Sequence, residues 1–195
     1  PHLGELWPAW LLRFAPQTAA PGLGSLEEDM AIAVMSFKRH NPHRKPLMNA
    51  TIREVNDGDY AAIGRLFFDT VRTVNLQDYT PQQVAAWAPA VWPAEDWRRR
   101  LAGQVVLVAV ERSALVGFIT IEKNGHIDFL FVHKDRQRQG IASALLARAI
   151  EQAQPLNLSR VFTESSITAK HFFERHGFLV TKPEDVVRHG VTLRR

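Results

Sequence analysis

Three successive segments near the middle of the chain are nearly continuous apolar runs. These segments are rich in β-branched and aromatic residues, and short turns such as Asn124-Gly125 separate them: Val105 to Glu111, Leu115 to Glu122 and His126 to Val132. The pattern predicts three neighbouring strands of an antiparallel meander. A further strand is predicted before them, from Thr51 to Val55.

Helical spacing marks the segments between the first strand and the meander. The turn Asn56 to Asp59 leads into an amphipathic helix, whose predicted buried stripe is Ile63, Leu66, Phe67, Thr70 and Val71. Thr80 is placed to cap a second helix that begins at Pro81. A third helix is predicted from Glu95 to Leu101.

Helix and strand patterns also follow the meander. A long helix is predicted from Gly140 to about Gln154, and its apolar face consists of Ile141, Leu145, Leu146, Ala149 and Ile150. A short strand at Arg160 to Thr163 and a helix at Ile167 to His176 come next. Phe178 to Val180, with Val186 to Leu193, are expected to form a closing strand or hairpin.

Together these elements predict one α/β (α+β) domain over residues 48–195. Residues 1–47 differ, because they hold six of the eleven prolines, and the first residue is not methionine. We expect a poorly structured extension that is either truncated or foreign to the natural protein. A capping box at Ser25 predicts at most a short helix at 25–37. The basic run Lys38 to Lys45 is interpreted as a solvated linker.

Composition narrows the function classes. The chain has no cysteine, which excludes disulfides, thiolate zinc sites and a cysteine nucleophile, and its histidines show no spacing typical of a metal site. No run of 18 apolar residues predicts a membrane span or a signal peptide, so the cytoplasm is the expected compartment. The net charge of +4 suits an anionic partner, either a phosphate-bearing cofactor or a nucleic acid.

The segment Asp135 to Ala142 carries the strongest chemical signal. A strand ends, Gly140 relieves a turn, and a helix begins at once with small residues, so several backbone N–H groups should point at one spot. Such a site suits a pyrophosphate, and Arg136 and Arg138 are candidates for further phosphate contacts. The glycine spacings of a dinucleotide fingerprint and of a nucleotide P-loop are both absent.

Two motifs resemble one known family. Gln137-x-x-Gly140-x-Ala142 resembles the acetyl-CoA signature of the GCN5-related N-acetyltransferases (GNAT), and Ala169-x-x-Phe-Phe173-Glu-x-x-Gly-Phe178 resembles their fourth helix. The order of elements over roughly residues 49–195 is also similar. The resemblance implies a twisted, mostly antiparallel sheet of six to seven strands, flanked by about four helices, with a splay between strands four and five.

The resemblance also implies a cofactor site for acetyl-CoA, with no metal. Backbone amides would hold the pyrophosphate at Gln137, Arg138, Gln139, Gly140, Ile141, Ala142 and Ser143. Main-chain groups of Leu130, Phe131 and Val132 would pair with the pantetheine arm, with a weaker contact from Ser166. The N–H of Leu130 would stabilise the negative charge that develops on the thioester oxygen.

Candidate acid–base residues lie nearby. Asp128 is the first candidate for the base, acting through water with His126, which period-two alternation places on the same face; His126, if it titrates near neutrality, could instead act as the base directly. The alternative is that Asp128 serves only a structural hydrogen bond and that His126 faces solvent in the turn. Glu122 and Glu164 are reserve candidates, each more readily interpreted as an exposed strand end. Many family members have a tyrosine where this chain has Phe173, so Tyr79 is a candidate for the missing acid.

The sequence therefore predicts an enzyme that transfers an acetyl group from acetyl-CoA directly to an amine of a small molecule or protein. Tyr79 and Trp87 are candidates for the acceptor pocket. A catalytically weak acetyl-CoA sensor is the first alternative, because of Phe173, and a nucleic-acid-binding module is the second. No membrane partner is expected, nucleic acid is disfavoured, and both a monomer and a homodimer remain open.

Overall fold

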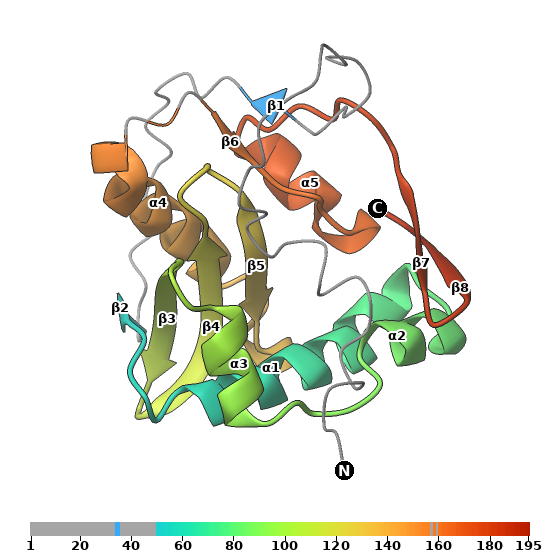
Figure 1. Cartoon of the computed structure of the whole chain (residues 1–195), viewed down its shortest axis with the longest axis horizontal. Coiled ribbons are helices and arrows are strands. Elements are labelled where there is room, and N and C mark those ends of the chain that lie inside the picture. Colours follow the sequence, from blue (N-terminus) through green and yellow to red (C-terminus); the bar gives the residue numbers. More distant parts are fainter. Residues whose placement is uncertain (1–33, 36–49, 157, 159) are drawn as a thin grey trace, which may run out of the picture.

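The computed structural model describes the backbone of residues 34–35 and residues 50–156, 158 and 160–195 (Figure 1). The first half of the described chain contains β1 (Val34–Met35), β2 (Thr51–Glu54), α1 (Tyr60–Thr73), α2 (Pro81–Trp87) and α3 (Ala94–Arg100). Then follow β3 (Val105–Glu111), β4 (Ala114–Ile121), β5 (Ile127–Val132), α4 (Ile141–Ala153), β6 (Val161–Phe162), α5 (Ile167–Arg175), β7 (Asp185–Arg188) and β8 (Val191–Arg194). Short 3₁₀ helices lie at Val74–Gln77, Lys134–Arg136 and Gln154–Leu156.

Four strands form an antiparallel sheet in the order β2-β3-β4-β5, which confirms the predicted meander. The other described strands pair outside this sheet, β1 with β6 and β7 with β8, so the predicted six to seven strands divide among three sheets. Among the described residues, β5 and β6 form no continuous ladder: an isolated parallel bridge joins His126 and Phe162, and Thr163 Oγ1 donates to Ile127 O at 2.9 Å. The predicted splay thus lies between β5 and β6, the fourth and fifth strands of the predicted domain.

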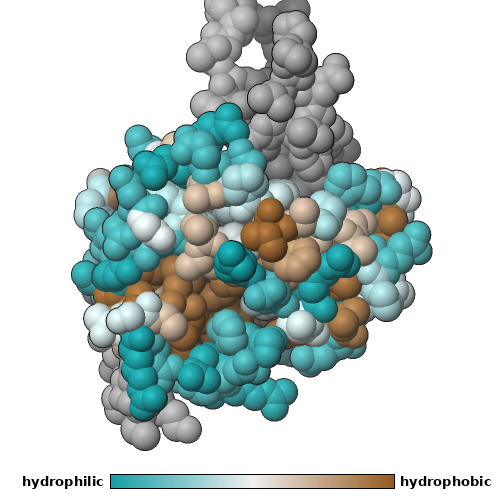
Figure 2. All heavy atoms as spheres, turned by 90° about the horizontal axis from the view of Figure 1, so that it is seen from below, coloured by the Kyte–Doolittle hydropathy of each residue, from teal (hydrophilic) through white to brown (hydrophobic). Residues whose placement is uncertain are grey.

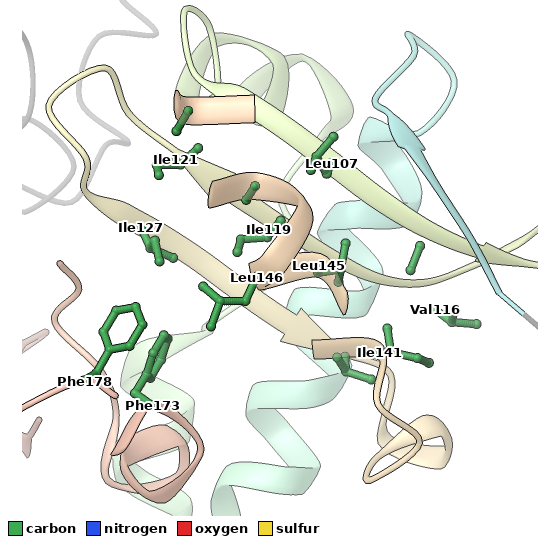
Figure 3. Packing of buried hydrophobic residues seen from close by; sticks show 14 residues of the cluster. Leu107, Val116, Ile119, Ile121, Ile127, Ile141, Leu145, Leu146, Phe173 and Phe178 are labelled. Atoms are coloured by element: carbon green, nitrogen blue, oxygen red, sulfur yellow. The ribbon is translucent and has the colours of Figure 1, made fainter. Parts of the chain in front are cut away.

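Helices cover both faces of the sheet. On one face, α4 packs Leu145 and Leu146 onto Ile119 and Ile127, and Figure 3 shows Phe173 and Phe178 beside this cluster. On the other face, residues of α1, α2 and α3 form a second apolar cluster with the sheet: Ile63, Leu66, Phe67, Val71, Val84, Trp97, Val106, Val108, Phe118 and Phe129. Every residue of the stripe predicted for the first helix is buried.

Helix starts follow local capping chemistry. The Thr80 hydroxyl accepts a hydrogen bond from the N–H of Gln83 at 3.2 Å, and the Thr80 N–H donates to Gln83 Oε1 at 2.9 Å, so α2 begins with a capping box before Pro81. Asp59 precedes α1, where its carboxylate accepts the N–H of Asn56 at 2.7 Å and pairs with Arg53. These bonds satisfy backbone N–H groups in the turns that precede α1 and α2.

Two predicted elements differ from the structure. Phe178 to Val180 is irregular rather than a strand, because Phe178 turns into the core against Phe173 while Leu179 and Val180 face outward. Val34–Met35 pairs antiparallel with β6, so the helix predicted over 25–37 is wrong at these two positions. The remainder of that helix, and the basic run at 38–45, lie outside the described residues.

The surface is mainly polar on the face seen from below, where apolar side chains form only a broken band (Figure 2). Among the described residues, none of the helices combines the length and the apolar character that a membrane crossing requires. Leu179 and Val187 are the most exposed large apolar side chains.

Candidate active site

The turn before α4 presents a concave set of backbone donors. Gly140 adopts the left-handed conformation, with φ of 83°, and no described atom lies within 4 Å of the position that a Cβ would take. The first amide of this region to find a main-chain acceptor is that of Ala144, which donates to Gly140 O at 3.0 Å. Within the described part of the chain, the amides of residues 137–143 donate no hydrogen bond. Seven donors at the positive end of a helix are therefore available to an anion.

The side chains of this turn do different work. Gln137 donates from Nε2 to Val132 O at 2.6 Å, which ties the turn to the end of β5. The prediction that Arg136 contacts phosphate does not fit, because its guanidinium pairs with Glu111 at 2.5 Å and donates to Asp135 O. Arg138 is exposed, and among the described residues it makes neither an ion pair nor a hydrogen bond. Of the two arginines, Arg138 is therefore the one whose charge is not paired with a described residue.

One edge of β5 faces the splay. The N–H of His133 donates to Val116 O at 2.8 Å, and Phe131 lies opposite Phe118 in register. Because inward and outward hydrogen bonding alternates along an antiparallel strand, the main-chain groups of Leu130 and Val132 point away from β4. The carbonyl of Val132 already accepts from Gln137 and from Thr70 Oγ1, so its N–H and both main-chain groups of Leu130 remain on the open edge.

A β-bulge sets the direction of Asp128. Thr120 pairs with Phe129 and Ile121 pairs with Ile127, which leaves Asp128 as the extra residue of β5. A bulge turns two successive side chains toward the same side of a sheet. Asp128 thereby joins Phe129 on the face covered by α3, and period-two alternation alone does not predict this.

Asp128 is held by one of its two oxygens. Its Oδ2 pairs with Arg100 at the end of α3 and accepts a long 3.5 Å hydrogen bond from Gln104. The side chains of Asp128 and Arg100 are only 12% and 9% exposed, and burial raises the pKa of Asp128 while the Arg100 charge opposes the rise. Oδ1 accepts no hydrogen bond from any described group, so it is available in the cavity.

His126 is buried, which corrects the expectation that it faces solvent in the turn. Its ring stacks on Phe162 at 5.0 Å, Nδ1 lies 3.6 Å from Glu122, and Nε2 lies 3.3 Å from Glu164. Burial alone would lower the pKa of His126, but the two carboxylates outweigh it and raise the pKa to about 9. His126 is therefore a cation at neutral pH and is not a base there, which revises its predicted role.

The two reserve carboxylates are also not simple exposed strand ends. Their side chains are each 22% exposed, and both contact the His126 ring. The hydrogen bond with His126 lowers the pKa of Glu122. Burial opposes ionisation of Glu164, but its hydrogen bond to His126 and the charges of His126, Arg195 and Arg188 together lower its pKa. Both groups are thus anions that hold the histidine cation in place.

Tyr79, Ser166 and Phe173 have structural partners. The Tyr79 hydroxyl donates to Arg194 O at 2.5 Å and accepts from the N–H of Ile167 at 3.0 Å, and burial raises its pKa. Its proton is thus committed, which argues against the predicted role of Tyr79 as the acid. Ser166 caps α5 by accepting the N–H of Ala169 at 3.2 Å. Phe173 is buried in the core.

A cavity of about 100 Å³ brings many of the predicted residues together. Its lining includes candidates from widely separated segments: Tyr79, Trp87, His126, Asp128, Phe131 and Ser166. Sequence reasoning missed the charged residues Arg100, Arg188 and Arg195 and ranked Glu164 too low. No local signal distinguishes them, since each acts through a partner distant in sequence. In the ranges with described coordinates, no group of three or more His, Cys, Asp or Glu side chains is placed to hold a metal ion.

Known proteins share this architecture. The family description "Acetyltransferase (GNAT) domain" matches residues 75–194. The chain is 37% identical over 142 residues to YafP of Escherichia coli (strain K12), described as an uncharacterized N-acetyltransferase, across 73% of this chain and 89% of that protein.

Solved structures agree at the level of the fold. A GCN5-related N-acetyltransferase from Rhodopseudomonas palustris superimposes with a TM-score of 0.72 at 24% identity, covering 77% of this chain and 94% of that one. PaiA N-acetyltransferase from Thermoplasma acidophilum, in complex with coenzyme A, gives a TM-score of 0.58 at 16% identity, covering 75% and 97%. YncA, a putative acetyltransferase from Salmonella typhimurium with its cofactor acetyl-CoA, gives 0.57 at 21% identity, covering 75% and 90%. The chain belongs to the GNAT family of acetyltransferases and is an acyltransferase.

Proposed function

We propose that the chain transfers an acetyl group from acetyl-CoA to an amine by direct attack. The observation that carries this proposal is the set of seven amides at residues 137–143 that donate to no described group, which follows β5 and its open edge at Leu130 along the chain. A diphosphate fits the donor set, and an extended pantetheine arm fits the strand edge as an added strand would. Arg138 is the side chain that adds charge at this end of the site.

The amine requires a group that takes its proton. Asp128 is the proposed acceptor, because Oδ1 is available while Arg100 fixes Oδ2 and because burial raises its pKa toward that of a useful base. The His126 cation lies between Glu122 and Glu164 and holds these two carboxylates in position beside the cavity. The N–H of Leu130 would donate to the thioester oxygen as negative charge develops there.

The leaving thiolate requires less help. Phe173 has no proton to donate, and the Tyr79 proton is bound to Arg194 O. A thiol has a pKa of about 8.5, so a thiolate is a competent leaving group near neutral pH and can take its proton from water. We therefore assign no acid among the described side chains and expect Tyr79 to hold the cavity wall.

An acetyl-CoA sensor with weak turnover is the second candidate, and the burial of Phe173 is the observation that favours it. Both functions require cofactor binding, so only turnover separates them. Thiol release that stays at the background rate for every amine, despite tight coenzyme A binding, would establish the sensor.

The test combines binding and turnover. Purified chain is incubated with acetyl-CoA and a panel of amines, and thiol release is followed alongside thermal shift with coenzyme A. We expect Asp128→Asn to lower kcat about 100-fold or more while coenzyme A binding persists. Gly140→Glu should abolish binding, since a carboxylate would enter the anion site, and Tyr79→Phe should keep most turnover. Normal coenzyme A binding by Gly140→Glu would overturn the proposed site.

A further inference from the structure

The hairpin formed by β7 and β8 closes one side of the cavity. Val186 lies opposite Leu193 in register, and both line the cavity, whereas Val187 is 64% exposed. Arg188 follows Val186 by two residues and therefore shares its inward face. The cavity wall thus consists of apolar side chains with a guanidinium beside them.

Two hydrogen bonds hold this hairpin to α2 and to the residue before its cap, and the hairpin lies beside α2 in Figure 1. The Tyr79 hydroxyl donates to Arg194 O at 2.5 Å, and Gln83 Nε2 donates to Thr192 O at 2.8 Å. Both bonds reach the main chain of β8, so they fix the strand and not merely its side chains. Arg188 lies on β7, which pairs with this strand through Val191.

Charged side chains of both signs line the cavity. Asp128 and Glu164 lie on the side of β5 and β6, where they pair with Arg100 and His126 and where Asp128 keeps Oδ1 available. The hairpin side contributes Arg188 and Arg195, and Arg195 pairs with Glu184 at 2.7 Å and lies 3.6 Å from Glu164. Burial, followed by the nearby Arg195 charge, lowers the pKa of Arg188 to about 10, so Arg188 stays cationic at neutral pH.

We propose that the acceptor is a small amine that also carries a carboxylate, and that Arg188 binds this carboxylate while the amino group lies at Asp128. A simple cationic amine would meet the guanidinium wall unfavourably, whereas an amino acid presents opposite charges to the two walls. Guanidinium also matches carboxylate geometry with two parallel hydrogen bonds. The aromatic lining, Tyr79, Trp87 and Phe131, suits an apolar side chain on that acceptor. This inference rests on the proposed function.

Matched acceptors test the proposal. Thiol release from acetyl-CoA is measured with L-phenylalanine against L-phenylalaninamide, and with O-phosphoethanolamine against ethanolamine as the phosphate arm. Each pair is run on the native chain, Arg188→Gln, Arg188→Lys and Arg148→Gln. Arg148 is a control on α4, where it is 53% exposed and pairs with Glu151 away from the cavity.

We expect Arg188→Gln to lower kcat/KM for L-phenylalanine about tenfold or more, mainly through KM, and to change L-phenylalaninamide less than about threefold. Arg188→Lys should restore part of the loss, and Arg148→Gln should match the native chain. If the ratio of kcat/KM for L-phenylalanine to that for L-phenylalaninamide is the same in Arg188→Gln as in the native chain, the inference is overturned. It is also overturned if Arg188→Gln lowers kcat/KM for O-phosphoethanolamine alone. Thiol release only with acceptors that lack a carboxylate would support the acetyltransferase activity but contradict the proposal that the acceptor carries a carboxylate. No release from any amine would instead contradict the proposed function.

Discussion

At the scale of single residues, the site depends on which charges are already paired. Arg136 and Arg138 flank the same turn, yet Arg136 is bound to Glu111 while Arg138 has no such partner among the described residues. From the sequence motif alone, both arginines are equally good candidates for phosphate contacts. Their partners, which lie elsewhere in the chain, decide which of them is available to phosphate.

This difference leads to a prediction. Arg138→Gln should weaken coenzyme A binding about threefold to tenfold at low salt, because one charge near the phosphates is lost. Arg136→Gln should change the affinity by less than about twofold. Calorimetric titration of both variants with coenzyme A provides the comparison, and an equal loss in the two would show that Arg136 leaves Glu111 when the cofactor binds.

A second prediction concerns Arg100, whose charge opposes the effect of burial on Asp128. His126 just before β5 and Glu122 just after β4 also act on this carboxylate, while Gln104 donates to it. Removing the guanidinium in Arg100→Gln should raise the pKa of Asp128, so more of it is protonated at pH 7. We expect kcat/KM to fall about tenfold or more there and the acidic limb of its pH profile to move to higher pH.

The pH profile separates this role from a merely structural one. Arg100→Lys keeps a positive charge and should return the acidic limb toward its original position. If Arg100→Gln lowers kcat/KM equally at every pH, the residue serves packing against Phe129, over whose ring its guanidinium lies at 5.4 Å, and not the ionisation of Asp128.

At the scale of elements, regular structure could be predicted well and its interruptions could not. The strands of the meander, the cap at Thr80 and the left-handed Gly140 follow from local residue preferences. The bulge at Asp128 adds one residue without disturbing the apolar pattern, so it leaves no trace in the sequence. The burial of His126 depends on Glu164 and Phe162, which the chain brings back only after α4.

Gly125 gives a prediction at this scale, because it sits where β5 begins beside β6. Its φ is +91°, and a Cβ there would lie 2.2 Å from the carbonyl oxygen of Arg160. Gly125→Ala should therefore lower the free energy of unfolding by about 3 kcal/mol or more, from left-handed strain together with a backbone clash.

Gly103 is the matched control for urea unfolding. It also has a positive φ, of +79°, but no described atom lies within 4 Å of a Cβ placed there. Gly103→Ala should cost only about 1 to 2 kcal/mol. Equal losses in the two variants would mean that β5 and β6 move apart readily, and the splay would then not be a rigid feature of the fold.

At the scale of the whole molecule, the junction at His126 joins the sheet to the C-terminal half. Glu122 follows β4, His126 precedes β5, and Glu164 follows β6, so one buried cation links three parts of the fold. A buried charge with two carboxylate partners stabilises the native state only while it is protonated. The stability of the entire chain should consequently depend on pH through this one group.

The sign follows from the pKa of His126, which is about 9 in the folded chain against a reference value of 6.5. The contribution is fully present below pH 6.5 and is lost as pH rises through 9, and it amounts to roughly 3 kcal/mol. The difference in the free energy of unfolding between the native chain and His126→Gln should thus shrink from pH 6 to pH 10. His171→Gln is the control, because the side chain of His171 is 87% exposed. A difference that stays constant over this range would show that His126 is buried neutral, with the junction held by packing against Phe162 rather than by charge.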